Sequence, residues 1–219
     1  MLRKAFMIVV LLWGASATAA AADLSPINLP PPDTKGGRPL MQCLNDRKTD
    51  RSFAPRKLAP EILSNLLWAA AGINRPEKKG RTAPTAHNRQ EIDVYVAMEE
   101  GLYLYAPESH SLRGAVKKDL RADTVHLFQP SRGSIANAPV QLIYVADYSK
   151  MGLASSEADK HFYAVADTGF ISQNVYLYCA SEGLATGVRA YFDKDALAKS
   201  MKLRDKQKVI LVQAVGYAQ

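Results

Sequence analysis

The chain of 219 residues has few cysteines and histidines and lacks the common nucleotide-binding and nucleophile motifs. It contains two cysteines, no CxxC pair, and four histidines that lie far apart in the sequence. Structural zinc sites need closely spaced Cys and His ligands, so we predict no metal site. The patterns GxGxxG, GxSxG and GxxxxGK are absent. A Rossmann pyrophosphate loop, a hydrolase nucleophile elbow and a P-loop are therefore not supported.

The chain also has no concentrated basic stretch. Its 28 Lys and Arg residues exceed its 21 Asp and Glu residues, giving a net charge of +7, but the two signs are interspersed. Nucleic-acid binding is therefore not predicted. An oxidising compartment would permit a disulfide between Cys43 and Cys179. The sequence spacing leaves open whether they pair or remain separate thiols.

No apolar run is long enough to cross a bilayer, because Ala5 to Trp13 is much shorter than the roughly 20 residues that a span needs. Arg3 and Lys4 precede this run, and small residues follow it up to Ala22. This pattern is typical of a cleavable secretory signal peptide over residues 1–22. We therefore expect a periplasmic or secreted protein without stable membrane insertion, and a mature net charge of +5.

The mature chain has an N-terminal arm followed by one domain. Residues 23–42 are rich in Pro and Gly and predict an extended arm, which is either loose or lies across a partner. Residues 43–219 are long enough for a single domain with a hydrophobic core. Its first predicted helix has Pro60 in the first turn and Gly72 at its end.

The remaining periodicities predict an α+β fold. A long helix is expected from about residue 155 to 182, with Gly183 at its end, and Asp193 is expected to cap a short helix. Residues 139–148 are continuously apolar, as in a strand covered on both faces. Residues 109–138 are expected to be mixed and partly helical. We predict a central, mostly antiparallel sheet of about five strands flanked by helices, with strands at 92–98, 101–107, 139–148, 183–192 and 208–217.

Four stretches in order carry a resemblance to a known family: DRKTDRSF, LLWAAAGINR, RTAPTAHNRQEIDVYV and DTGFISQNVYLYCASEGLATGVRAYFD. Together they resemble the FMN-dependent nitroreductase-like superfamily, in particular its SagB-type dehydrogenase branch. The segment EEGLYLYAPESHSLRGAV is also similar to that branch. The resemblance covers about residues 43 to 217 and implies a nitroreductase-like, FMN-binding domain.

The first of these stretches is implied to bind the FMN phosphate and ribityl chain. The matching residues are Arg47, Lys48, Thr49 and Arg51. Guanidinium groups offer forked donors to phosphate oxygens, and a hydroxyl adds one more. Taken alone, this stretch favours a solvated charged turn, and the other three stretches shift the interpretation to a phosphate site.

The segment TAPTAHNRQ is implied to pass over one face and edge of the flavin ring. Close backbone approach is expected at Pro84, Thr85 and Ala86, and hydrogen bonds to the pyrimidine edge at Asn88 and Gln90. Relatives commonly have a small residue where this chain has His87. Both a substrate-facing role and a surface position remain open for that residue.

The segment GLATGVRAYF is implied to run beside the flavin. Thr186 and Gly187 allow close approach, and a backbone amide near Ala190 and Tyr191 is expected to reach N5, the atom that accepts and releases hydride. Arg189 interrupts this apolar stretch. Whether it faces the phosphate, a substrate anion or solvent stays open.

The resemblance implies an FMN-dependent oxidoreductase that transfers hydride between a donor such as NAD(P)H and a small acceptor, for example a nitroaromatic or quinone. It also implies a homodimer with two interfacial flavin sites, for which the long helix bearing Tyr176 and Tyr178 is suited. No catalytic side chain is identified. The alternatives are an exported flavin- or ligand-binding protein without turnover, and an azoline dehydrogenase. Phosphate anchors beyond the last strand are missing, and Lys160 and Tyr163 do not form the adjacent pair of azoline oxidation.

Overall fold

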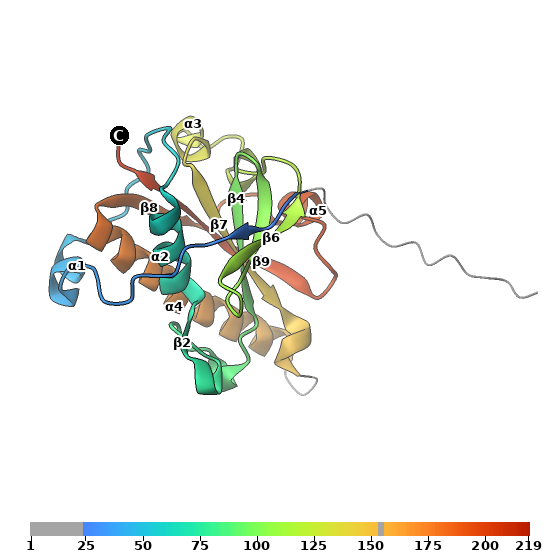
Figure 1. Cartoon of the computed structure of the whole chain (residues 1–219). Helices are drawn as coiled ribbons and strands as arrows, with labels where there is room; N and C mark the ends of the chain where they lie inside the picture. The colour runs from blue at the N-terminus through green and yellow to red at the C-terminus, as the bar shows by residue number, and fades with distance from the viewer. Residues whose placement is uncertain (1–23, 153–155) are drawn as a thin grey trace, which may run out of the picture.

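A seven-stranded, fully antiparallel sheet forms the centre of the molecule in the computed structural model, which describes residues 24–152 and 156–219 (Figure 1). The predicted signal peptide lies outside the described residues. In spatial order the strands are β1 (Ile27–Asn28), β6 (Ser111–Val116), β5 (Gly101–Ala106), β4 (Ile92–Met98), β7 (Val140–Asp147), β9 (Gln207–Tyr217) and β8 (Leu184–Arg189). A separate small ribbon pairs β2 (Ile73–Arg75) with β3 (Gly80–Arg81).

Helices cover the sheet and its ends. The α-helices are α1 (Leu40–Asp46), α2 (Pro60–Ala71), α3 (Arg132–Ala136), α4 (Glu157–Glu182) and α5 (Lys194–Ser200). Short 3-10 turns are η1 (Pro76–Lys78), η2 (Ala86–Asn88), η3 (Ala122–Thr124) and η4 (Tyr148–Met151). The α+β architecture predicted from the sequence is confirmed, with seven strands in the sheet where about five were expected.

Local sequence signals fix the helix ends. Pro60 occupies the first turn of α2, where its missing N–H costs nothing. Helix α4 begins with a capping box between Ser156 and Asp159, and ends at Gly183 in the left-handed conformation. The Asp193 carboxylate accepts a hydrogen bond from the Ala196 amide, so it caps α5 as predicted.

Strand β7 is buried on both faces, which explains its continuous apolar sequence. Leu142 and Tyr144 point into the core cluster that includes residues of α2 and α4. Ile143 and Val145 point into the opposite cluster, which includes Leu197 of α5. The sheet therefore separates two hydrophobic layers, with α2 and α4 over one face and α5 over the other.

The prediction for residues 109–138 missed a strand. The region contains η3 and α3, but it begins with β6, which pairs with β5. Gly114 in β6 allows the N-terminal segment to cross closely, because a Cβ at this position would lie 2.2 Å from the carbonyl oxygen of Leu24. The weak alternation of SLRGAV results from this crossing and from the exposed Arg113.

The predicted arm lies along its own chain. Residues 24–39 are irregular or extended apart from β1, which pairs with β6, while α1 begins inside the range expected to be arm. The Pro30 carbonyl accepts a hydrogen bond of 2.6 Å from Ser64 of α2, and the Arg38 amide donates to Ser181 of α4 at 2.9 Å. Within residues 24–152 and 156–219, no helix has the length and apolar character that a membrane span requires.

Candidate functional site

The segment that carries the predicted phosphate ligands is extended and lies between α1 and α2. Its alternate residues Arg47, Thr49 and Arg51 face α4 and β8. The Thr49 hydroxyl lies 3.0 Å from the Tyr176 hydroxyl, and Arg51 donates a 3.4 Å hydrogen bond to the Val188 carbonyl. The structure therefore brings three of the four residues of this cluster against α4 and the edge strand β8.

Tyr176 joins these elements. Its hydroxyl accepts a hydrogen bond of 3.0 Å from the Val188 amide, and the Arg47 guanidinium lies over its ring at 5.4 Å from the centroid. Since the Val188 amide occupies a lone pair, the tyrosine proton is free to be donated to Thr49. The Thr49 proton then remains available for an oxygen of a ligand.

Strand β8 needs small residues where this segment crosses it. A Cβ at Gly187 would lie 3.2 Å from Arg51 Cγ and 3.3 Å from Thr49 Cγ2, so any larger residue would push both side chains away. Thr186 is buried, and its carbonyl accepts a hydrogen bond of 2.9 Å from the Asp50 amide. The segment therefore covers the open edge of the sheet at a fixed register.

Lys48, the fourth predicted ligand of the cluster, lies on the other side of the segment. Its ammonium group is 3.7 Å from the Asp50 carboxylate, and its side chain is 78% exposed. Both residues line a separate cavity of about 260 Å³ that is also bordered by Asp46. Lys48 therefore borders this cavity and pairs with Asp50, whereas Arg47 and Arg51 contact Tyr176 and Val188.

Arg47 and Arg51 form no ion pair with a carboxylate in the described part of the chain. Arg189, by contrast, is buried and points into the protein, where it donates to Gln141 at 2.8 Å and to the Thr124 hydroxyl at 3.2 Å. Burial, reinforced by the nearby charge of Arg51, lowers the pKa of Arg189 to about 10. Arg47 and Arg51, which have no carboxylate partner in the described part of the chain, therefore lie beside α4 and β8 near the surface, and Arg189 is buried beneath them.

Backbone donors are available where β8 ends. Ala190 and Tyr191 follow the strand and are exposed, and neither amide has a hydrogen-bond acceptor among residues 24–152 and 156–219. The Tyr191 ring is 62% exposed and stacks on His126 with 4.2 Å between the ring centroids. Because Arg51 bonds to Val188, these amides lie only a few residues from the cationic cluster.

The loop TAPTAHNRQ has an unusual backbone. His87, Asn88 and Gln90 have φ angles of 55°, 52° and 50°, in the left-handed region that residues other than Gly seldom adopt. The Ala86 amide donates a 2.9 Å hydrogen bond to the Asp167 carboxylate of α4. Such strained positions persist only when surrounding contacts enforce them, and they concentrate at binding sites.

Within this loop the predicted residues differ in their surroundings. Pro84, His87 and Asn88 are exposed, which places His87 at the surface. Gln90 is held by the loop itself, because its side chain accepts a 2.9 Å hydrogen bond from Arg81 and its amide group donates to Asn88 at 3.0 Å. The Asn88 side-chain oxygen therefore accepts a hydrogen bond within the loop.

One chain does not bring all the predicted residues together. The loop is attached to α4 at Asp167, whereas the cationic cluster contacts the same helix at Tyr176. Nine residues of α-helix separate these points, which is about 13 Å at 1.5 Å per residue. The predicted ligands therefore form two groups at different positions along α4.

Sequence reasoning missed the role of Tyr176 and assigned it, with Tyr178, to a helix face suited to a partner. Tyr176 is 7% exposed and contacts Thr49, and Tyr178 donates a hydrogen bond of 3.2 Å to the Ile62 carbonyl of α2. Both tyrosines stabilise the fold of one chain. No local pattern marks such a role, because both contacts join distant parts of the sequence.

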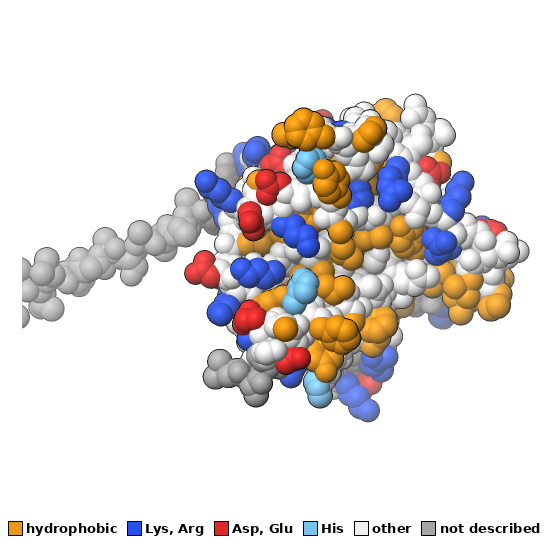
Figure 2. Space-filling model, turned by 180° about the vertical axis from the view of Figure 1, so that it is seen from behind, with side chains coloured by type: hydrophobic (Ala, Val, Ile, Leu, Met, Phe, Trp, Pro, Cys, Tyr) orange, Lys and Arg blue, Asp and Glu red, His pale blue; other side chains and the backbone are white. Residues whose placement is uncertain are grey.

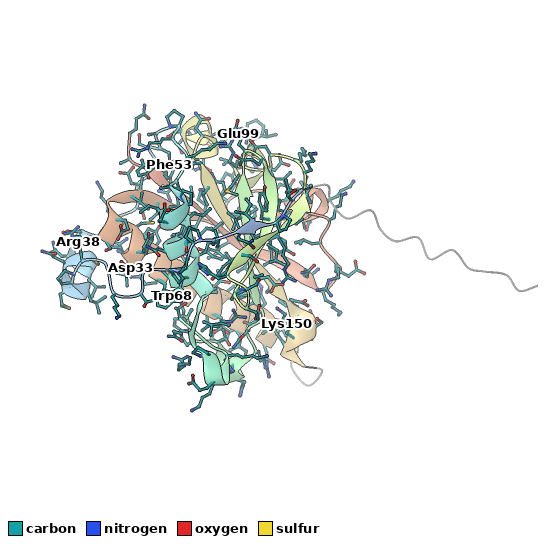
Figure 3. All side chains as sticks on the ribbon, viewed as in Figure 1. Asp33, Arg38, Phe53, Trp68, Glu99 and Lys150 are labelled. Carbon is teal, nitrogen blue, oxygen red and sulfur yellow. The ribbon has the colours of Figure 1, made fainter. Side chains whose placement is uncertain are left out.

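Three further findings concern the cysteines, metal binding and the N-terminal arm. Cys43 and Cys179 are both buried and not bonded to each other. Among residues 24–152 and 156–219, no group of His, Cys, Asp or Glu side chains could hold a metal ion. A groove of about 490 Å³ lies along the arm, where Asp33, Arg38 and Trp68 lie near one another (Figure 3).

Comparisons with known proteins agree with this architecture. Residues 44–217 match the model of the Nitroreductase family. A candidate nitroreductase of Methanocaldococcus jannaschii is 30% identical over 185 residues, which cover 81% of this chain and 90% of that protein. The crystal structure of a candidate nitroreductase from Ralstonia eutropha superposes with a TM-score of 0.80 at 38% identity, covering 89% of this chain and 90% of the other.

A more distant similarity concerns the fold alone. A chain of the E. coli microcin synthetase complex with a truncated pro-microcin bound has a TM-score of 0.67 at 20% identity, covering 80% of this chain and 72% of that chain.

Proposed function

Because this chain belongs to the nitroreductase family, we propose that it is an FMN-dependent oxidoreductase that moves a hydride through flavin N5 between a donor and a small organic acceptor. The family indicates an oxidoreductase, and its members generally use flavin cofactors. One observation supports FMN as the cofactor. Arg47, Thr49 and Arg51 lie together beside the amides at the end of β8, which have no acceptor in the described part of the chain.

The residues present fit a phosphorylated flavin. Arg47 and Arg51 lack carboxylate partners in the described chain and lie on either side of a hydroxyl whose proton is available. This donor set matches a phosphate group, which accepts forked hydrogen bonds from guanidinium groups. Lys48 is excluded from the proposed set because it pairs with Asp50 on the other side.

When bound, the flavin supplies the hydride chemistry itself. The protein residues bind and orient it. The cationic pair fixes the phosphate end, and the amides of Ala190 and Tyr191 provide donors for negative charge that develops on a ring nitrogen. Preformed donors of this kind stabilise such charge without having to reorganise during the reaction.

We further propose that the protein is a homodimer in which each site takes residues from both chains. The cluster, which is proposed to hold the phosphate, and the loop, which is expected at the ring, contact α4 at Tyr176 and Asp167, so the two groups are separate enough to come from different chains. A second copy could supply the loop. Helix α4 exposes Phe162, Val165 and Phe170, and α1 exposes Leu40, Met41 and Leu44.

Hydrophobic side chains also gather on the face opposite to that of Figure 1, where they form a band between groups of Lys and Arg (Figure 2). Exposed apolar surface of this kind marks contact sites for other molecules. The small-molecule donor and acceptor are proposed to use the space above the flavin ring in turn. We propose a periplasmic or secreted location from the signal-like N-terminus, which makes NAD(P)H only one of the donors to test.

The test is reconstitution. The purified protein is incubated with FMN, desalted, and its visible spectrum is recorded before and after anaerobic addition of NADPH or dithionite. Retained flavin absorption that NADPH bleaches supports the reductase with this donor. Bleaching by dithionite alone, followed by reoxidation with a quinone or nitroaromatic, supports an oxidoreductase with another donor. Retained flavin that no acceptor reoxidises indicates a binding protein without turnover, and a colourless protein refutes the proposed cofactor.

A further inference from the structure

Glu91 is a fully buried carboxyl group without a visible donor. It connects the TAPTAHNRQ loop to β4 and has an exposed fraction of 0%. Neither of its carboxyl oxygens has a hydrogen-bond donor in the described part of the chain. An isolated, ionised carboxylate is too costly to bury, so such a group must either find donors or take up a proton.

The group that faces Glu91 is another carboxyl, Asp167 of α4. Its exposed fraction is 2%, and its Oδ2 accepts the 2.9 Å hydrogen bond from the Ala86 amide. Asp167 is close enough to Glu91 to raise the pKa of the Glu91 carboxyl. Two ionised carboxylates both accept and cannot bond, but one proton between them makes Glu91 a donor and Asp167 an acceptor.

The surrounding charges do not remove the need for this proton. The Glu91 backbone amide and, more weakly, Arg89 lower the pKa of Glu91, but burial has the largest effect and raises it, and Asp167 acts in the same direction as burial. Lys150 is 2.7 Å from Asp93 and donates to the Gln90 carbonyl. Asp147, whose amide bonds to the Glu91 carbonyl, directs its own carboxylate to Arg204 at 2.6 Å.

We propose that Glu91 and Asp167 share one proton, and that this protonated pair holds residues 85–90 against α4 in the strained conformation that the flavin site uses. Both are positioning residues, since they act through the loop. The pairing itself is independent of any ligand. Its consequence for flavin binding rests on the proposed function.

The pair explains why the loop keeps three left-handed residues. The Ala86 amide is anchored to Asp167. In the proposed pair, Glu91 at the other end of the loop bonds to the same carboxylate, so both ends of the turn are fixed at one point. Burial, then the proximity of Asp167, raises the pKa of Glu91 to about 7. Loss of the proton above that pH leaves two buried negative charges facing each other, and the loop should separate from α4.

The first measurement uses the wild-type full chain without flavin. Carboxyl carbons are labelled with ¹³C and followed by NMR from pH 5 to 8.5, while hydrogen exchange reports the protection of the amides of residues 85–90. We expect one side-chain carboxyl to titrate near neutral pH, and the Ala86 amide to lose protection at least 10-fold over the same interval. A Glu91 carboxyl that is already ionised at pH 5 overturns the proposal.

Two conservative variants separate shared-proton pairing from general packing. In Glu91→Gln the amide donates to Asp167 at every pH, so the loop should stay protected and lose its pH dependence. In Asp167→Asn the new amide can donate to ionised Glu91, and the transition should move to lower pH or disappear. Glu77→Gln changes an exposed carboxyl on η1 and should behave as wild type. Wild-type pH dependence in Glu91→Gln refutes the pairing.

Flavin binding is measured last, so that the two proposals fail separately. If FMN binds, its affinity in the wild type should fall as pH rises through 7, and in Glu91→Gln it should change less than 2-fold. If no FMN binds at any pH, the proposed function fails while the NMR and exchange results still decide the carboxyl pair. The Glu91 carboxyl could titrate near neutral pH as expected while the wild type binds FMN with the same affinity at every pH. That result would refute the proposal that the Glu91–Asp167 pair controls FMN binding.

Discussion

The Tyr176 hydroxyl lies 3.0 Å from the Thr49 hydroxyl across 127 residues of sequence, and it accepts the Val188 amide at the same distance. A single oxygen therefore connects the cationic segment, the longest helix and the last edge strand. The position of the proposed phosphate ligands depends on this contact, because the segment has no regular secondary structure of its own between residues 47 and 50.

Replacing either outward arginine should weaken flavin binding. We expect Arg47→Ala and Arg51→Ala each to raise the Kd for FMN by about 10-fold or more, since a hydrogen bond to a charged group contributes roughly 1.5–3 kcal/mol. Fluorescence titration of FMN measures this. Lys48→Ala is the matched control and should change the Kd less than about 2-fold because Lys48 pairs with Asp50. Equal losses in all three variants would contradict the assigned geometry.

Tyr176→Phe should affect both stability and binding. It removes the acceptor of the Val188 amide and the partner of Thr49, so the free energy of unfolding should fall by about 1–3 kcal/mol. Urea denaturation measures the loss, and FMN titration should show weaker binding. Tyr178→Phe loses one hydrogen bond to Ile62 and is expected to be destabilised without any change in FMN affinity. Weakened binding in this second variant would argue against a specific role of Tyr176.

Charge on the exposed face of α4 should prevent dimer formation. Phe162 and Phe170 are 69% and 48% exposed, and their replacement by Glu places negative charge in the proposed interface. Light scattering after size-exclusion chromatography should give the monomer mass and show reduced FMN retention. Lys199→Glu alters α5, which packs on the other face of the sheet, and should leave the mass of the dimer unchanged. A wild-type protein that is monomeric would refute the shared site.

Asp147 should contribute to acid unfolding. Burial favours its neutral form, but hydrogen bonds from Ser149 and Arg204 outweigh this effect and lower the pKa of Asp147 below its ordinary value of 3.8. A lowered pKa stabilises the folded state above the unfolded pKa, and that stability is lost as pH falls through the folded pKa. Thermal melts between pH 7 and 2 should show a smaller loss at low pH for Asp147→Asn than for wild type.

The sign is opposite for Glu91. Its raised pKa means that its stabilising contribution is complete below about 4.5 and is lost between there and about 7. The Asp147→Asn comparison is therefore made relative to wild type at each pH, so that the Glu91 effect cancels. If Asp147→Asn lost as much thermal stability at low pH as the wild type, the hydrogen bonds from Arg204 and Ser149 would not control the ionisation of Asp147.

The sequence predicted the elements whose signals are local. Helix α4 has apolar residues at three- and four-residue steps and ends at Gly183, and β7 is continuously apolar because both faces are covered. Strand β6 was missed because its residues do not alternate between buried and exposed. Gly114 in its middle is needed for the close approach of Leu24, and it carries no strand signal. The two-residue strand β1 has no signal of its own, since it is defined only by its pairing with β6.

The candidate site was predicted through resemblance, and its geometry was not. The sequence singled out Arg47, Lys48, Thr49 and Arg51 together, whereas the proposal to leave Lys48 out of the phosphate site follows from its contact with Asp50. The Glu91–Asp167 pair joins residues 76 positions apart, and each looks like an ordinary surface carboxyl in its own stretch of sequence. Burial in three dimensions, which no local pattern records, gives both residues their significance.

The place of β9 in the sheet has a consequence for biogenesis. It is the last strand in sequence, yet it lies between β7 and β8 and pairs with both. Strand β8 precedes β9 in the chain but has no place in the sheet until β9 has been synthesised. Long-range pairing of this kind folds slowly. Strand β8, which carries the contacts to Thr49 and Arg51, therefore joins the sheet only after β9 has paired with β7.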